Sequence, residues 1–497
     1  MWGPLIIAML YFVILIGLAN YFLHSKVKTM VDFSMGGQSL TWGLVTLAMA
    51  LIPHGSGHTM SLWESSALLG AAVLWWPIIV GGAFIPIMMF WTGPWLRSLK
   101  VETVPQAMGL LFGSRMRYLH CAIQISTWTA IAMAETLATA GAIYGLCGGV
   151  LPYFPGCIIL AFILMVGYII FGGVLELVWI STINVIVMTV GSYLALFSLG
   201  LWLAANWGGW DGILNTYAQA NELWKFDLFN FSPEIIFQVV IPVAVLHICA
   251  GGVAQGMYIP LLSARSDEDC RKGFWICSLT NVVTCFPWVI IAMVGMAIPA
   301  FAAIGPKLIV MEVALKTMPQ WIYALLMVSL LTSVLSTGSA IIMGNATVLV
   351  NDILKSACFP NMKDETRMKL MRPMILVCGL LAAVPALFAP ILFPVFLWAF
   401  SFGIPLFVIF LFGLVWKTSR PAAWITVVVT YIVNFWWTFA TPAWAQGPWA
   451  LNMYPVTVCS LVLGIVLFAI LPGEAGLLKR NRDAAKLAQM SVDSPAV

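Results

Sequence analysis

The sequence predicts an all-α integral membrane protein with about 13 transmembrane helices. Its 497 residues are 62% hydrophobic and only 8% charged, whereas about a quarter of the residues in a soluble chain are charged. Apolar runs of about 20 residues, the length that crosses about 30 Å of hydrocarbon, recur along the whole chain. Short loops separate these runs, so no stretch is long enough to form a separate soluble domain.

The apolar runs can be placed one after another along the chain. The first run is not expected to be a cleaved signal peptide, because no basic residue precedes it and Lys26 and Lys28 follow it. The predicted spans are residues 4–23, 40–62, 68–93, 117–146, 151–172, 178–205, 233–254, 273–303, 317–349, 370–389, 391–416, 420–440 and 454–472.

The distribution of basic residues between the loops predicts the orientation. With the N-terminus outside, all but three of the 23 Lys and Arg residues lie in cytoplasmic loops or in the C-terminal tail. The exceptions are Lys225, Lys307 and Lys316. This asymmetry follows the positive-inside rule, and an odd number of spans then places the C-terminus inside.

Composition also excludes several classes of protein. The net charge of +4 comes from the basic loops and does not indicate a nucleic-acid partner. The chain has no glycine-rich nucleotide-binding loop, which argues against an ATP-driven pump. The ten cysteines form no CxxC pair, and we interpret them as small buried hydrophobic residues.

Two spans carry proline and glycine at mid-depth. Residues 51–61, LIPHGSGHTMS, interrupt the second span, and residues 242–256, PVAVLHICAGGVAQG, interrupt the seventh. Each stretch has a proline, then a histidine (His54 or His247), then two glycines. Such breaks free backbone groups that lipid cannot satisfy, so they persist where they face protein or a water-filled cavity. Ordinary kinked helices are the alternative, but matching interruptions in two halves of a chain indicate the central site of a transporter.

Four stretches extend this interpretation: VDFSMGGQSLTWGLV (31–45), VETVPQAMGLLFG (101–113), FGGVLELVWISTINVIV (171–187) and LLTSVLSTGSAIIMGNATVLVNDILK (330–355). In this order they resemble motifs of the sodium:solute symporter family, which includes sodium-coupled sugar, proline, pantothenate and sialic acid transporters. The resemblance covers most of residues 30–420.

The resemblance implies a core of two five-helix repeats of inverted topology, like that of the leucine transporter. It also implies a division of the chain into parts. These are a peripheral first helix and loop (1–30), the transport core (31–416, with repeats at about 40–205 and 233–416), peripheral C-terminal helices (417–473) and a cytoplasmic tail (474–497).

The resemblance further implies a sodium site. Na⁺ is a hard cation that prefers oxygen ligands, and a broken helix beside hydroxyl side chains supplies them without a full buried charge. Ser336 and Thr337 match the paired sodium-binding hydroxyls of the family, and Ser333 matches a carbonyl donor. On the broken helix, Leu51 and His54 fall at the matching carbonyl positions, within one residue. The alternative is that these hydroxyls only join packed membrane helices.

One departure from the family concerns the number of ions. Many members have Thr-Asp after the tryptophan of the sixth span, where this chain has Ile180 and Ser181 after Trp179. That aspartate often supports sodium binding, and in some members a second sodium. Its absence predicts one coupled ion.

A second departure is Glu135 in the fourth span, where many members carry glutamine. A carboxylate near mid-membrane is a candidate functional residue, because burying a charge there is costly. Trp128 lies seven residues earlier, two helical turns away on the same face. A carboxylate beside a tryptophan ring suits an ammonium group. Alternatively, Glu135 carries a proton or forms a hydrogen bond in helix packing, with Trp128 facing lipid.

The histidines of the two breaks are further candidates. We assign His54 to hydrogen bonding with the solute or with helix ends, and His247 to the solute together with Gly251 beside it. His58 is assigned a structural role. The spacing of His54 and His58 would suit a metal ion on a regular helix, but the glycines are expected to unwind this helix, so we do not favour a metal ion there.

Two of the 23 tryptophans are also assigned to the solute site. Trp63 and Trp398 lie beside helices that line the site in relatives. Several others cluster near span ends, as in an interfacial aromatic belt; these are Trp75, Trp76, Trp91 and Trp95.

These observations predict a secondary active transporter, not an enzyme. Na⁺ drives import of a small polar organic solute by alternating access, without an organic cofactor. We favour an amine, zwitterion or quaternary ammonium solute. The alternatives are a carboxylate or a sugar, proton coupling through Glu135, and a transporter-like sensor with a separate partner. The expected partners are the solute and the lipid bilayer, in the plasma membrane and most simply a bacterial inner membrane. The sequence does not indicate the oligomeric state.

Overall fold

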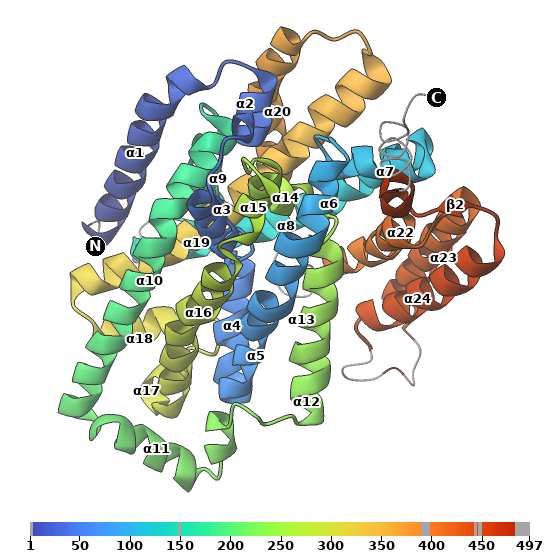
Figure 1. The fold of residues 1–497 in the computed structure, drawn as a ribbon. Coiled ribbons are helices and arrows are strands. Elements are labelled where there is room, and N and C mark those ends of the chain that lie inside the picture. The colour runs from blue at the N-terminus through green and yellow to red at the C-terminus, as the bar shows by residue number, and fades with distance from the viewer. Residues whose placement is uncertain (1–2, 148–150, 389–397, 442–444, 446–449, 483–497) are drawn as a thin grey trace, which may run out of the picture.

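The computed structural model describes residues 3–147, 151–388, 398–441, 445 and 450–482. Within them the chain is nearly all helical, and the helices pack into one bundle (Figure 1). The long helices turn large apolar side chains outward, among them Val13, Phe197 and Val462, each more than half exposed. Such a surface is unfavourable in water and favourable in lipid.

The first half of the bundle contains α1 (Gly3–Leu23), α2 (Met30–Met35), α3 (Trp42–Leu51), α4 (Ser56–Leu69), α5 (Trp75–Ile79), α6 (Gly93–Ser98), α7 (Val104–Phe112), α8 (Ser114–Leu146), α9 (Ile158–Gly167), α10 (Gly173–Asn206) and α11 (Gly209–Gln219). The second half contains α12 (Pro233–Ile235), α13 (Ile241–Leu246), α14 (Gln255–Leu262), α15 (Asp267–Arg271), α16 (Phe274–Ala297), α17 (Pro299–Ala302), α18 (Ile309–Thr317), α19 (Gln320–Val348), α20 (Asp364–Ala386), α22 (Gly403–Val415), α23 (Arg420–Phe439), α24 (Met453–Ile470) and two short strands, β1 (Lys417–Thr418) and β2 (Glu474–Ala475). Short 3₁₀ and π-helical turns extend several of these helices.

Eleven helices in the described part of the chain are long and apolar enough to cross a membrane. Two shorter apolar helices, Trp42–Leu51 and Pro155–Gly167, fall within the predicted spans at 40–62 and 151–172. The predicted all-helical membrane protein is therefore confirmed. The count of thirteen spans and the orientation of the termini stay predictions.

The second predicted span is broken. Helix α3 ends at Leu51 and α4 begins at Ser56, with residues 52–55 outside both helices. The N–H of His54 closes a turn onto the carbonyl of Leu51 (2.8 Å), and Gly55 is extended (φ −66°, ψ 173°). Proline cannot donate to the helical ladder and glycine has low helix propensity, which explains why LIPHGSG ends one helix and starts another.

The seventh predicted span is broken as well. A π-helical turn, His247–Gly251, ends the first part, and α14 begins at Gln255. Ala254 between them is extended (φ −84°, ψ 118°). The prediction of two interrupted helices is therefore confirmed.

The two breaks lie at a similar depth in the bundle. Leu40, before α3, forms backbone hydrogen bonds with Ser263 and Arg265, after α14 (3.1 and 2.9 Å). These bonds align the ends of α3 and α14 that lie away from the breaks. Helix α3 has 10 residues and α14 has 8, which correspond to about 15 and 12 Å at a rise of 1.5 Å per residue. Both breaks therefore lie at nearly the same depth in the bundle.

Two of the motif-like stretches meet at one end of the bundle, where α7, α8 and the segment after α19 converge. The Asp352 carboxylate accepts hydrogen bonds from the Thr103 hydroxyl (2.7 Å) and the Arg117 guanidinium (2.7 Å). Glu102, next to Thr103, pairs with Arg367 of α20 (2.5 Å). Asp352 is fully buried, and removing one partner of a buried ion pair typically costs about 3–5 kcal/mol. The Asp352 contacts fasten the segment after α19 to α7 and α8, and the Glu102–Arg367 pair fastens α20 to the start of α7.

Helix α19 lies at the centre of the bundle, and the terminal helices lie at its edges. In the most apolar stretch of the span Gln320–Cys358, which contains α19, 94% of the residues are buried, against 22% for α1 and 28% for α24. Figure 1 shows α1 at one side and α23 and α24 at the opposite side. Strand β2 pairs with β1, so the chain returns from α24 to the start of α23.

Candidate functional site

A small cavity lies between the two breaks. Its volume is about 20 Å³, which is room for about one water molecule. Pro53 and Gly55 border it from the first break, and Gly251 from the second. Much of its wall is apolar and aromatic; these residues are Phe84, Trp128, Ile131, Met257 and Phe400. The polar side chains at the wall are His58, Glu135, His247 and Thr337.

Glu135, from the middle of α8, reaches the start of α4. Its side chain is buried. A Cβ atom added to Gly55 would collide with Oε1 of Glu135 and would lie 3.0 Å from Cγ2 of Thr337. The carboxylate thus lies beside the N-terminus of α4, where the helix dipole favours a negative charge. The break, Glu135 and α19 therefore form one site.

Aromatic rings line much of the remaining wall. Trp128 and Phe400 meet edge to face, with ring centroids 5.4 Å apart. The His247 ring lies 6.0 Å from that of Phe400 and 6.2 Å from that of Phe84. Aromatic faces attract cations, and a carboxylate among them strengthens that attraction. The wall is therefore suited to a small positively charged group.

Oxygen atoms gather where the first break meets α19. The Thr337 hydroxyl donates to the carbonyl of Ile52 (2.7 Å), and the Ser333 hydroxyl donates to the carbonyl of His54. The carbonyl of Ser333 lies 3.0 Å from the Ser336 hydroxyl and 3.3 Å from that of Thr337. Hydroxyl and carbonyl oxygens without a carboxylate suit a hard monovalent cation.

The second break satisfies its freed backbone groups differently. The carbonyl of Gly252 accepts from the Tyr258 hydroxyl (2.8 Å), and the carbonyl of Val253 lies 3.3 Å from Nε2 of His120. The N–H of Gln255 donates to the side chain of Gln124 (3.4 Å). At the second break the partners are therefore side chains of α8 and α14, whereas at the first break two carbonyls accept from hydroxyls of α19. The oxygen cluster belongs to the first break.

The structure brings some of the predicted site residues to the cavity and others not. Trp128, Glu135, His247 and Gly251 border the cavity. The Leu51 carbonyl accepts from the His54 N–H, and the carbonyl of the next residue meets Thr337 instead.

Two predicted tryptophans do not border the cavity. Trp63 donates to the carbonyl of Lys307 (3.1 Å) and packs on Trp288. Trp398 donates to the Thr438 hydroxyl (2.8 Å) on α23. Each ring is held on another part of the bundle, and the structure does not bring either to the site.

Sequence reasoning missed several side chains at or near the cavity, among them Phe84 and Phe400 of its wall. The interfacial position expected for Trp76 is wrong, because its ring is buried 5.0 Å from His58 and 6.0 Å from His247. His58, expected to be structural, borders the cavity. Cys285 of α16 contacts His54 and His58. No local pattern marks Cys285, which lies 227 residues from His58 along the chain.

Replacing Gly55 by alanine is expected to destabilise the protein by about 1–3 kcal/mol, because the added methyl group must displace Glu135 and Thr337 from a packed interior. Thermal unfolding of the purified chain would show a lower midpoint. Gly141→Ala on α8 is the control, since nothing lies within 4 Å of a Cβ atom there. Equal midpoints for the two variants would show that the first break does not pack against Glu135 as described.

Comparisons with known proteins give a consistent result. The profile of the Sodium:solute symporter family matches residues 33–426. A sodium/glucose cotransporter of Vibrio parahaemolyticus is 22% identical over 467 residues, covering 85% of this chain and 82% of that protein. Sodium/glucose cotransporter 1 of Sus scrofa is 24% identical over 223 residues, covering 43% of this chain and 32% of that one. A solved structure of a Na⁺-coupled sialic acid symporter, in a substrate-bound outward-open state, has a TM-score of 0.78 at 16% identity, covering 95% of this chain and 99% of that one.

Proposed function

The chain belongs to the sodium:solute symporter family and is a sodium-coupled solute transporter of the membrane, and we propose that it imports a small amine, zwitterion or quaternary ammonium solute through the cavity beside Glu135. The observation that carries this proposal is that a buried carboxylate and several aromatic rings line one cavity where the first helix break meets α19.

The proposed sodium site is the oxygen cluster between the first break and α19. Its ligands are the Ser336 and Thr337 hydroxyls, the Ser333 carbonyl and the carbonyls at the break. The 2.7 Å contact between Thr337 and the Ile52 carbonyl supports this assignment, because it brings a side-chain oxygen and a freed backbone oxygen together. It also favours Ile52 over Leu51 as the backbone ligand, within the one-residue range expected from the sequence.

The composition of the cavity wall supports a cationic group in the solute. Among the described residues that border the cavity there is no Lys or Arg, so a solute with a net negative charge would meet no cationic side chain there. The wall offers four polar side chains, fewer than the many hydroxyls of a sugar would require, since unpaired buried polar groups are costly. Glu135 with Trp128 and Phe400 matches an ammonium group better.

A sugar is the second candidate solute. Relatives from Vibrio parahaemolyticus and Sus scrofa are named sodium/glucose cotransporters, although their identity to this chain is below 25%. His58 and His247 at the wall could hydrogen-bond sugar hydroxyls or a carboxylate.

The proposed mechanism couples the ion to the solute through the first break. Na⁺ bound there would hold α3 and α4 against α19 and so shape the adjoining cavity. The cavity has room for about one water molecule, so the wall must move apart to admit a solute and close around it. The core at residues 31–416 would then open to the other side, as it can only if the ligands bind the two states differently. In this proposal the end of the bundle with α2, α7 and α15 faces the cytoplasm.

Uptake into proteoliposomes tests the proposal. With an inward Na⁺ gradient and a labelled panel of a quaternary ammonium compound, an amino acid, a carboxylate and glucose, we expect accumulation of the first two classes. Because one charge at 100 mV, negative inside, is worth about 2.3 kcal/mol, such a potential by itself would raise the accumulation of a zwitterion carried with one Na⁺ roughly 50-fold. Accumulation of glucose alone would favour the second candidate. Binding without Na⁺-dependent accumulation would indicate a sensor.

A further inference from the structure

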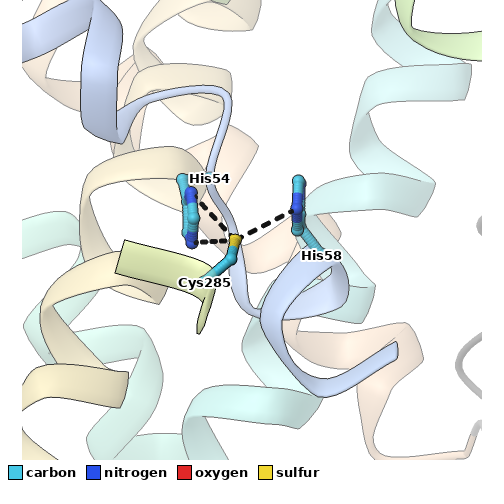
Figure 2. Close-up of side chains that lie close together, drawn as sticks. All are labelled: His54, His58 and Cys285. Carbon is cyan, nitrogen blue, oxygen red and sulfur yellow. Dashed lines mark hydrogen bonds between the residues drawn. The ribbon is translucent and has the colours of Figure 1, made fainter. Parts of the chain in front are cut away.

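Three metal-ligating side chains from two parts of the fold meet beside the cavity. His54 and His58 flank the start of α4, and Cys285 lies in the middle of α16. Sγ of Cys285 is 3.3 Å from Nε2 of His54 and 3.7 Å from Nε2 of His58. Figure 2 shows the sulfur between the two imidazole rings. All three side chains are buried, and one potential ligand atom from each lies within 4.8 Å of the others.

These separations match a metal complex. Imidazole nitrogen and thiolate sulfur are the ligands of zinc and of other borderline transition metals. With metal–sulfur and metal–nitrogen distances of about 2.3 and 2.0–2.1 Å, tetrahedral geometry places sulfur and nitrogen about 3.6 Å apart. The two observed separations, 3.3 and 3.7 Å, lie on either side of that value.

A hydrogen-bonded thiol is the simpler alternative. A single S–H group can donate to one imidazole, and the sulfur can weakly accept from the other. The rings of His54 and His58 are stacked with an angle of 11° between their planes, so their lone pairs do not yet converge. Metal binding requires one ring to turn, and His58 can do so because it borders the cavity.

A fourth side chain of the right chemistry is close. The His247 ring lies 5.9 Å from that of His58 and borders the same cavity. Its Nδ1 is 3.1 Å from the carbonyl oxygen of Val243. A proton on Nδ1 then leaves a lone pair on Nε2, which is the usual arrangement of a metal-ligating histidine. The cluster therefore has both a three-ligand set and a neighbour that can complete it.

We propose that His54, His58 and Cys285 bind one borderline transition-metal ion, such as Zn²⁺ or Co²⁺, with the fourth coordination position directed to the central cavity. Cys285 binds as the thiolate, so each ion bound releases the thiol proton. His54 has two roles in this arrangement, since its ring is a metal ligand and its backbone carbonyl meets Ser333 in the oxygen cluster.

Co²⁺ binding to the purified full-length chain tests this proposal. A cysteine ligand gives Co²⁺ a sulfur-to-metal charge-transfer absorption band in the near ultraviolet. We expect this band to saturate at one ion per chain and to disappear in Cys285→Ser. Cys277→Ser is the matched control, because Cys277 is equally buried on α16 and is not part of the cluster. In His58→Ala the affinity for Co²⁺ should fall at least about tenfold.

Thermal unfolding provides a second measurement on the same samples. Zn²⁺ is expected to raise the unfolding midpoint of the wild-type chain and of Cys277→Ser, but not that of Cys285→Ser, because a ligand stabilises only the state that binds it. A wild-type chain without the charge-transfer band, or a band that persists in Cys285→Ser, would overturn the proposal. The measurements involve no transport, so their failure would leave the proposed symporter function untouched.

Discussion

Replacing Thr337 by valine is expected to raise the Na⁺ concentration for half-maximal uptake by roughly 5- to 150-fold. Valine preserves the shape of the side chain and removes its oxygen, which is 2.7 Å from the Ile52 carbonyl. Loss of one ligand and one buried hydrogen-bond partner corresponds to about 1–3 kcal/mol, and about 1.4 kcal/mol is a factor of ten. Initial uptake rates in proteoliposomes, measured as a function of Na⁺ concentration, would show the shift.

Two further variants separate a sodium ligand from a packing residue. Thr347→Val makes the same change on α19, where the hydroxyl of Thr347 is buried and donates to the Met343 carbonyl of its own helix; it should leave the sodium dependence unchanged. Thr337→Ser restores the oxygen and should restore most of the sodium affinity. If Thr337→Val and Thr347→Val behave alike, the oxygen cluster is not the sodium site.

Replacing Glu135 by glutamine is expected to reduce uptake of a cationic or zwitterionic solute by roughly 10- to 100-fold, measured as kcat/KM. The substitution keeps the size and shape of the side chain, removes its charge and replaces one acceptor oxygen with an NH₂ donor. A hydrogen bond to a charged group contributes about 1.5–3 kcal/mol, and the solute loses this when the carboxylate is replaced. The loss should fall on the solutes that carry an ammonium group.

The matched control is Glu176→Gln on α10. Glu176 is also a buried glutamate, but its carboxylate accepts from the backbone N–H of Gly172 (2.7 Å) and does not border the cavity. The preference of this variant among the solutes should stay close to that of the wild-type chain. If Glu135→Gln abolishes uptake of uncharged solutes and spares the cations, the carboxylate does not recognise the ammonium group. Uptake that loses its pH dependence in Glu135→Gln would instead indicate proton transfer through this residue.

The broken helices were the most informative prediction from the sequence. Proline and glycine disfavour a regular helix through their own backbone geometry, so LIPHGSG and the stretch around Gly251 marked the two interruptions in the sequence. The sequence could not show that the two breaks are satisfied differently. That outcome depends on His120 and Gln124, which α8 brings to the second break, and on Tyr258 of α14 itself.

The solute site was predicted in part. Glu135 and Trp128 lie on one regular helix, so their spacing along α8 was enough to place them on one face. No spacing along a shared helix placed Trp63 or Trp398 at the site. Their rings donate hydrogen bonds to the carbonyl of Lys307 and to the hydroxyl of Thr438, on other parts of the bundle. Trp76 shows the reverse case, because its position near a span end suggested the membrane interface, whereas the fold buries it against His58.

The sequence by itself determined the lipid environment, the nearly continuous helical content and the two interruptions, since hydropathy and backbone preference are properties of short stretches. Only the tertiary structure decided that the Thr337 hydroxyl meets the carbonyl of Ile52, that Glu135 lies beside Gly55, and that Cys285 lies between two histidines more than 200 residues away. Contacts of this kind depend on how whole helices pack against one another, and no local pattern of residues records that packing.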